Sequence, residues 1–122
     1  MNQILVSVEP TFIVEQSETA KKRFVFSYRV TIENSGTLSA QLISRHWIIT
    51  NGNGDTQEVR GEGVLGDQPH IAPGERFSYT SGAILETAVG SMHGSYQMVN
   101  AEGQAFEAPI EPFTLAGPMA LH

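Results

Sequence analysis

The sequence predicts an all-β sandwich of about seven short antiparallel strands, because apolar and polar residues alternate in short stretches that are separated by turn signals. No stretch keeps apolar residues at spacings of three and four, so no long helix is expected. The 122 residues fit a single domain over 1–122, with residues 117–122 expected to form a disordered tail.

The two central strands show the clearest alternation. The first follows Arg23, ends at Asn34-Ser35-Gly36, and has an apolar parity made of Phe24, Phe26, Tyr28, Val30 and Ile32. The second is expected over residues 40–51, with Ile43, Trp47 and Ile49 on one face and Leu42, Ser44, His46 and Ile48 on the other. The tetrapeptide Asn51-Gly52-Asn53-Gly54 predicts a hairpin, with the return strand over residues 56–60.

The N-terminal stretch is predicted to be an edge strand that bends. Ile4, Val6 and Val8 share one parity up to Pro10, a residue found in sheets mainly on edges or at bulges, and the pattern resumes over residues 12–15. Further strands are expected over residues 77–85, 95–99 and 106–115, with a type II turn at Pro73-Gly74 before the first of these.

Two aromatic residues favour an immunoglobulin-like or fibronectin III-like sandwich. Trp47 lies centrally in the third strand, and Tyr96 lies two residues before Met98, as a tyrosine-corner residue precedes the second cysteine of antibody domains. We therefore expect Trp47 and Tyr96 to share one core with Phe26 and Val30.

A glycine-rich segment, residues 59–67, contains Gly61, Gly63 and Gly66 in a G-x-G-x-x-G pattern. A dinucleotide fingerprint needs a helix after its glycines, because the helix N-terminus holds the pyrophosphate. Residues 68–74 contain two prolines and a glycine, so the motif is expected to be a loop between strands.

Two interpretations of this loop remain open. Consecutive amides of Gly61, Gly63 and Gly66 could converge on a phosphate, with Arg60 adding charge. Alternatively, the loop is a tight bend or a surface that contacts a protein partner. Glu62 and Asp67 would repel an anion, which favours the second interpretation.

Composition excludes several classes of partner and chemistry. The net charge of −6, with 7 Lys and Arg residues, disfavours nucleic acid and anionic membranes. The chain has no cysteine, which excludes disulfides and thiolate sites and suits a reducing compartment. The N-terminus lacks a signal-peptide pattern, and no stretch is long enough to span a bilayer, so a cytoplasmic location is expected.

No catalytic site, metal site or cofactor is predicted. His46, His70, His93 and His122 show no spacing that places two ligands on one metal, and no G-x-S-x-G elbow is present. His46, on the face opposite Trp47, is expected to be a structural histidine with a hydrogen-bond partner.

Four segments together resemble the bacterial ApaG family over nearly the whole chain. They are Ser44-Arg45-His46-Trp47-Ile48-Ile49, Gln57-Glu58-Val59-Arg60-Gly61-Glu62-Gly63-Val64-Leu65-Gly66-Asp67-Gln68-Pro69, Tyr79-Thr80-Ser81-Gly82 and Gly94-Ser95-Tyr96-Gln97-Met98. The resemblance implies a small cytosolic β-sandwich, and a similar domain in certain eukaryotic F-box proteins and a DNA polymerase delta-interacting protein implies a role in protein contact. It also implies a link to cobalt tolerance and magnesium efflux, under the name CorD. The family's glycine motif, proposed to bind pyrophosphate, matches Gly61, Gly63 and Gly66.

The expected function is that of a non-catalytic binding module acting through residues 60–68, with Arg60, Gly61, Gly63 and Gly66 as the candidate site. A protein partner is the first expectation, linked through the resemblance to divalent-cation homeostasis. A pyrophosphate-containing small molecule or dinucleoside polyphosphate is the alternative, and an enzyme acting on phosphoanhydrides comes third. The sequence leaves the oligomeric state open.

Overall fold

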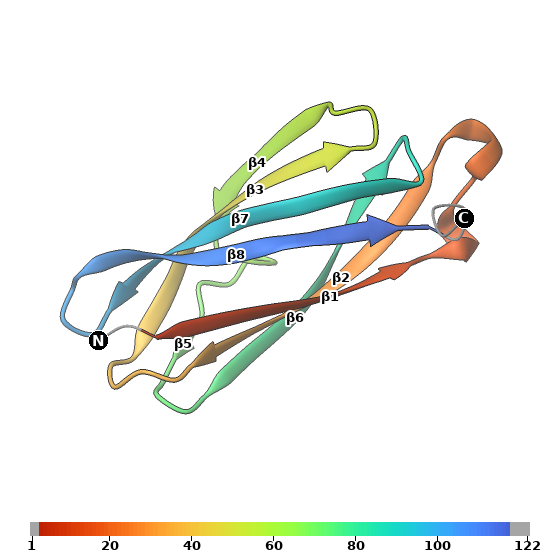
Figure 1. Cartoon of the computed structure of the whole chain (residues 1–122). Coiled ribbons are helices and arrows are strands. Elements are labelled where there is room, and N and C mark those ends of the chain that lie inside the picture. Colours follow the sequence, from red (N-terminus) through yellow and green to blue (C-terminus); the bar gives the residue numbers. More distant parts are fainter. Residues whose placement is uncertain (1–2, 118–122) are drawn as a thin grey trace.

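The computed structural model describes residues 3–117 as two antiparallel sheets packed face to face (Figure 1). The first sheet has the order β1-β2-β6 and consists of β1 (Ile4–Phe12), β2 (Phe24–Asn34) and β6 (Arg76–Leu85). The second has the order β4-β3-β7-β8 and consists of β3 (Ala40–Asn51), β4 (Thr56–Glu62), β7 (Val89–Asn100) and β8 (Ala105–Ala116). The short β5 (His70–Ile71) pairs with β3. This arrangement confirms the immunoglobulin or fibronectin III-like sandwich.

Two single turns of 3-10 helix, η1 (Val14–Gln16) and η2 (Thr19–Lys21), connect β1 to β2. Beyond the two sheets, β1 lies beside β8 and closes one side of the sandwich (Figure 1). The expected disordered tail falls almost entirely on residues 118–122, which lie outside the described part of the chain.

The core contains the four residues expected to share it: Phe26, Val30, Trp47 and Tyr96 are each at most 2% exposed and belong to one cluster. The Trp47 ring joins the two sheets. It makes edge contacts with Tyr28 of β2 at 5.4 Å between ring centres, and with Tyr96 of β7 at 6.4 Å. Such aromatic pairs add stability beyond the area they bury.

The faces of β3 differ from the expected alternation at Leu42 and at Ile43, which was expected beside Trp47 but is only half-buried and lies outside the core cluster. Leu42 was expected opposite Trp47, yet both are buried, because the register with β7 shifts between Leu42 and Ser44. The shift is a β-bulge at Ile43, and one extra residue moves the preceding side chains to the other face. The placement of Leu42 on the outer face was therefore wrong.

The N-terminal strand is an edge strand as predicted, and Pro10 lies within it opposite Tyr28. The expected resumption of the strand over residues 12–15 is wrong, since β1 ends at Phe12. Beyond the last β1–β2 pair, the Ser17 hydroxyl links the two segments. It donates to the Ile13 carbonyl at 2.8 Å and accepts the Val25 N–H at 2.9 Å.

Two strands are longer than expected. The return strand β4 continues through Gly61 to Glu62, and β7 begins at Val89 rather than at residue 95. Glycines conceal the first half of β7 in the sequence because they have low strand propensity. Gly94 is required there, since a Cβ at this position would overlap the His46 carbonyl oxygen of β3.

Replacing Trp47 by Ala is expected to lower the free energy of unfolding by about 3 to 5 kcal/mol, because it leaves a cavity where the ring contacted both sheets. Chemical denaturation followed by circular dichroism measures this loss. Ile48→Ala, at the half-buried neighbour that faces outward, is the matched control and should cost less. A loss below about 1 kcal/mol for Trp47→Ala would contradict the observed core.

Candidate functional site

The glycine motif begins in β4 and continues into the loop that connects β4 to β5, a loop between strands as expected from the prolines that follow it. Its three glycines differ in conformation and in surroundings. Gly61 lies within β4 opposite Arg45, whereas Gly63 and Gly66 have positive φ angles of +61° and +84°. Each glycine is therefore required for a different structural reason.

The tip of the loop is a tight two-residue turn from Val64 to Asp67. The N–H of each residue donates to the carbonyl of the other, at 2.8 and 2.9 Å. Leu65 and Gly66 between them both have positive φ, 50° and 84°, which defines a type I′ turn. A glycine suits the second position, while Leu65 occupies an unusual conformation for a branched residue.

The two apolar residues of the turn point in opposite directions. Val64 is 1% exposed and belongs to the hydrophobic core, so it anchors the loop in the sandwich. Leu65 is 66% exposed, more than any other large apolar side chain in the described part of the chain. The loop thus presents a single leucine to solvent from a fixed base.

Three amides of the motif already have backbone partners. The Gly63 N–H donates to the Ile43 carbonyl at 2.8 Å, and the Val64 and Asp67 amides hold the turn. The Ile43 carbonyl also accepts the Gln68 side-chain amide at 2.9 Å. An anion bound through Gly63, Val64 and Asp67 would have to displace these hydrogen bonds.

The Arg45 side chain fixes the base of the loop. Its guanidinium donates to the Gly63 carbonyl at 2.8 Å and to the Glu62 carbonyl at 3.3 Å. The guanidinium lies directly over Gly61, because a Cβ on that residue would be 2.7 Å from Nη1 of Arg45. Gly61 is therefore needed for the room it leaves to Arg45.

The contact of Arg45 with the loop was not predicted from the sequence. A signal was present, however. The hairpin predicted at residues 51–54 joins two strands that pair Thr50 with Thr56, and the same register places Arg45 opposite Gly61. A long cationic side chain facing a strand glycine indicates that the side chain lies across the partner strand.

Close to Arg45, a hydrogen bond joins the two sheets through the hydroxyls of Tyr79 in β6 and Tyr96 in β7. The bond is buried, and both rings are at most 8% exposed. Tyr96 therefore bonds a side chain of the opposite sheet, whereas the hydroxyl of an antibody tyrosine corner bonds backbone a few residues upstream. Burial raises the pKa of Tyr79 to about 12, although the Tyr96 hydrogen bond and the Arg45 charge oppose the shift. Burial also raises the pKa of Tyr96.

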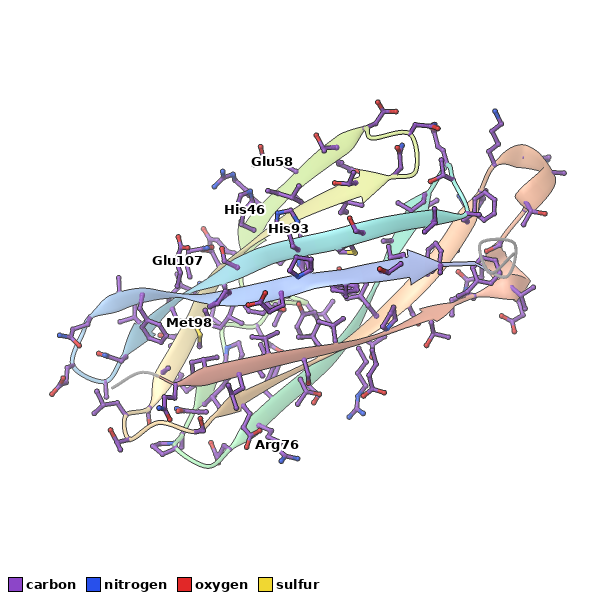
Figure 2. All side chains as sticks on the ribbon, viewed as in Figure 1. His46, Glu58, Arg76, His93, Met98 and Glu107 are labelled. Carbon is purple, nitrogen blue, oxygen red and sulfur yellow. The ribbon has the colours of Figure 1, made fainter. Side chains whose placement is uncertain are left out.

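His46 and Arg60 meet at one carboxylate on the outer face of the second sheet. Glu58 Oε2 lies 2.7 Å from Nε2 of His46 and 3.3 Å from Nη2 of Arg60, and Figure 2 shows His46 and Glu58 on the neighbouring strands β3 and β4. The His46 hydrogen bond, followed by the Arg60 charge, lowers the pKa of Glu58. His46 has the partner expected of a structural histidine, and the Arg60 side chain lies beside the loop at 72% exposure.

Two further observations concern residues 3–117. No group of three or more His, Asp or Glu side chains among them could hold a metal ion. Nor does this part of the chain contain a helix long and apolar enough to cross a membrane.

The fold and the loop define a small two-sheet β-domain whose glycine motif forms a strand-to-strand loop held from the core. The family model for the ApaG domain matches residues 14–100. The chain belongs to the ApaG domain family.

Similar proteins cover almost the whole chain. It is 59% identical over 121 residues to Protein ApaG of Pseudomonas paraeruginosa, covering 99% of this chain and 96% of that protein. Identity to Protein ApaG of Azotobacter vinelandii is 58% over 120 residues, covering 98% and 95%. The crystal structure of a protein from Bordetella pertussis described as a putative ApaA protein superposes with a TM-score of 0.94 at 51% identity, covering 96% and 95% of the two chains.

Alanine at the two positive-φ glycines is expected to have unequal effects. Gly66→Ala should cost about 1 kcal/mol of stability for its φ alone, because a Cβ there meets open space. Gly63→Ala should cost more than about 2 kcal/mol, because its Cβ would also overlap the Asp67 carbonyl oxygen. Denaturant unfolding of both variants tests this order, and equal losses would contradict the turn geometry.

The raised pKa of Tyr79 predicts a loss of stability at alkaline pH. The folded protein holds this proton more tightly than the unfolded chain, whose tyrosines ionise near pH 10. The contribution is therefore complete below about pH 10 and is lost as the pH rises toward 12, the folded-state pKa of Tyr79. The free energy of unfolding, measured across this range, should decrease as the pH rises. In Tyr79→Phe this decrease should be smaller. An unchanged slope in Tyr79→Phe would refute this assignment.

Proposed function

We propose that this protein is a non-catalytic binding module that recognises another protein through the loop of residues 60–68. The observation that carries the proposal is the type I′ turn, which holds Leu65 at 66% exposure above a base fixed by Val64 and Arg45. An apolar side chain on a rigid support loses little conformational freedom when it enters a partner's pocket.

Charge around the turn indicates the chemistry of the partner. Glu62 and Asp67 flank Leu65, both are exposed, and neither is in an ion pair within residues 3–117. A complementary surface therefore has an apolar pocket for Leu65 with Lys or Arg at its rim. The same two carboxylates oppose an anionic ligand at this loop.

The link to divalent-cation homeostasis is part of this proposal. The module acts on cobalt or magnesium levels through the protein it binds, and the ions themselves bind it weakly. Pyrophosphate binding is the second candidate and is one outcome of the test below.

The first experiment is an amide-resolved NMR titration with pyrophosphate, diadenosine tetraphosphate, Mg²⁺ and Co²⁺ in turn. We expect no saturable shifts of the amides of residues 61–67, because the Gly63, Val64 and Asp67 amides are bonded within the chain. Low-micromolar pyrophosphate binding centred on these amides, weakened by salt and by Arg60→Ala, would instead establish the anion site.

The second experiment compares immobilised wild type, Leu65→Ala and Leu5→Ala in quantitative capture from a bacterial lysate. Leu5, 57% exposed on β1, is the matched control away from the loop. A partner bound through the loop should be reduced at least about tenfold by Leu65→Ala, the loss typical of an interface anchor, and retained by Leu5→Ala. Capture that is equal across the three proteins would exclude this loop as the contact surface.

A further inference from the structure

The free edge of β6 lacks the protection that the other sheet edges carry. The sheet order leaves β1, β4, β6 and β8 as edge strands, and the two-residue β5 is a further, very short edge that pairs only with β3. β1 contains Pro10, β4 contains three charged residues among its seven, and β8 contains two prolines and a register shift. After Arg76, β6 has no charge, no proline and no register shift up to Leu85. Such an edge is a template for another strand.

The hydrogen-bond pattern identifies which groups of β6 face outward. The Asn34 N–H donates to the Glu75 carbonyl, so the odd-numbered residues of β6 exchange hydrogen bonds with β2. The even-numbered residues then direct their N–H and C=O groups away from the sheet. In the described part of the chain no backbone group of residues 77–85 bonds an element other than β2. The outward groups belong to Ser78, Thr80, Gly82 and Ile84.

The sequence of this edge is complementary to itself. If two copies pair antiparallel about a two-fold axis at Ser81, Thr80 lies opposite Gly82 and Ser78 lies opposite Ile84 of the second copy. In the same register Arg76 lies opposite Glu86 of the second copy, at both ends of the pairing. Arg76 is 68% exposed with a 3.7 Å contact to Glu33, and Glu86 is exposed directly after β6, so both can meet a new partner.

We infer that two copies of this chain associate through β6, which joins their three-stranded sheets into one continuous sheet. The four outward residues of each copy then exchange about eight backbone hydrogen bonds. Two ion pairs set the register, and no like charges oppose each other between them. The surface is separate from the loop of residues 60–68, so the inference stands or fails independently of the proposed function.

A single introduced cysteine tests the axis, because the chain has no cysteine of its own. Opposed residues of a non-hydrogen-bonded pair lie about 4.5 Å apart at Cα, within disulfide range, so Ser81→Cys should form a covalent dimer in a glutathione buffer. Ser78→Cys is the control. Its side chain is more exposed than that of Ser81. In the dimer it lies opposite Ile84 of the second copy, so the two introduced cysteines would not meet and little disulfide should form. Random collisions would link Ser78→Cys faster, and that result would overturn the inference.

A charge exchange tests the register in sedimentation equilibrium. Arg76→Glu or Glu86→Arg alone should raise the dimer dissociation constant about tenfold, because two like-charge contacts replace two ion pairs. The double variant, which restores opposite charges, should return it to within about threefold of wild type. Additive losses in the double variant would exclude this register.

A backbone variant tests the edge itself. Thr80→Pro removes one outward N–H and should yield a monomer, while Thr80→Ala keeps the N–H and should still dimerise. Circular dichroism checks that Thr80→Pro retains its strands. A wild-type protein that stays monomeric up to about 1 mM, or a folded Thr80→Pro dimer, would overturn the inference.

Discussion

The β-bulge at Ile43 is the constraint on which both the core and the loop depend. Because β3 has one extra residue at the bulge, Leu42 before it and Trp47 after it both point into the core. It also leaves the Ile43 carbonyl available to the loop, where it accepts hydrogen bonds from the Gly63 N–H and the Gln68 side chain. The same irregularity therefore completes the hydrophobic cluster and holds the segment that follows β4.

The sequence predicted those strands whose apolar parity is unbroken. β2 alternates buried and less buried residues from Phe26 to Asn34 and pairs regularly on both sides, so periodicity alone was sufficient. Where an additional residue or a glycine interrupts the period, the prediction failed. Leu42 changed face because pairing between strands decides where a bulge lies, and the start of β7 was hidden because Gly90 and Gly94 serve close backbone approach.

The candidate site was predicted in position and only partly in construction. The prolines after the motif were sufficient to exclude a helix, and the loop lies where they indicated. A glycine in a sequence does not say whether it provides a positive φ or room for a neighbour. Gly63 and Gly66 provide the former, and Gly61 provides room for Arg45, a residue that is distant in the chain. Such contacts depend on strand register, which a single sequence specifies only where a turn fixes it.

The division of the turn between Val64 and Leu65 has an evolutionary consequence. Inward-facing residues of this segment are held by the interior of the sandwich, and most changes there would impair folding. The outward-facing residues, Leu65 and its acidic neighbours, are exposed and do not pack in the core, so changes there should affect folding less. Binding preference can therefore drift at the outer positions while the scaffold stays constant, so one architecture can acquire new partners through few substitutions.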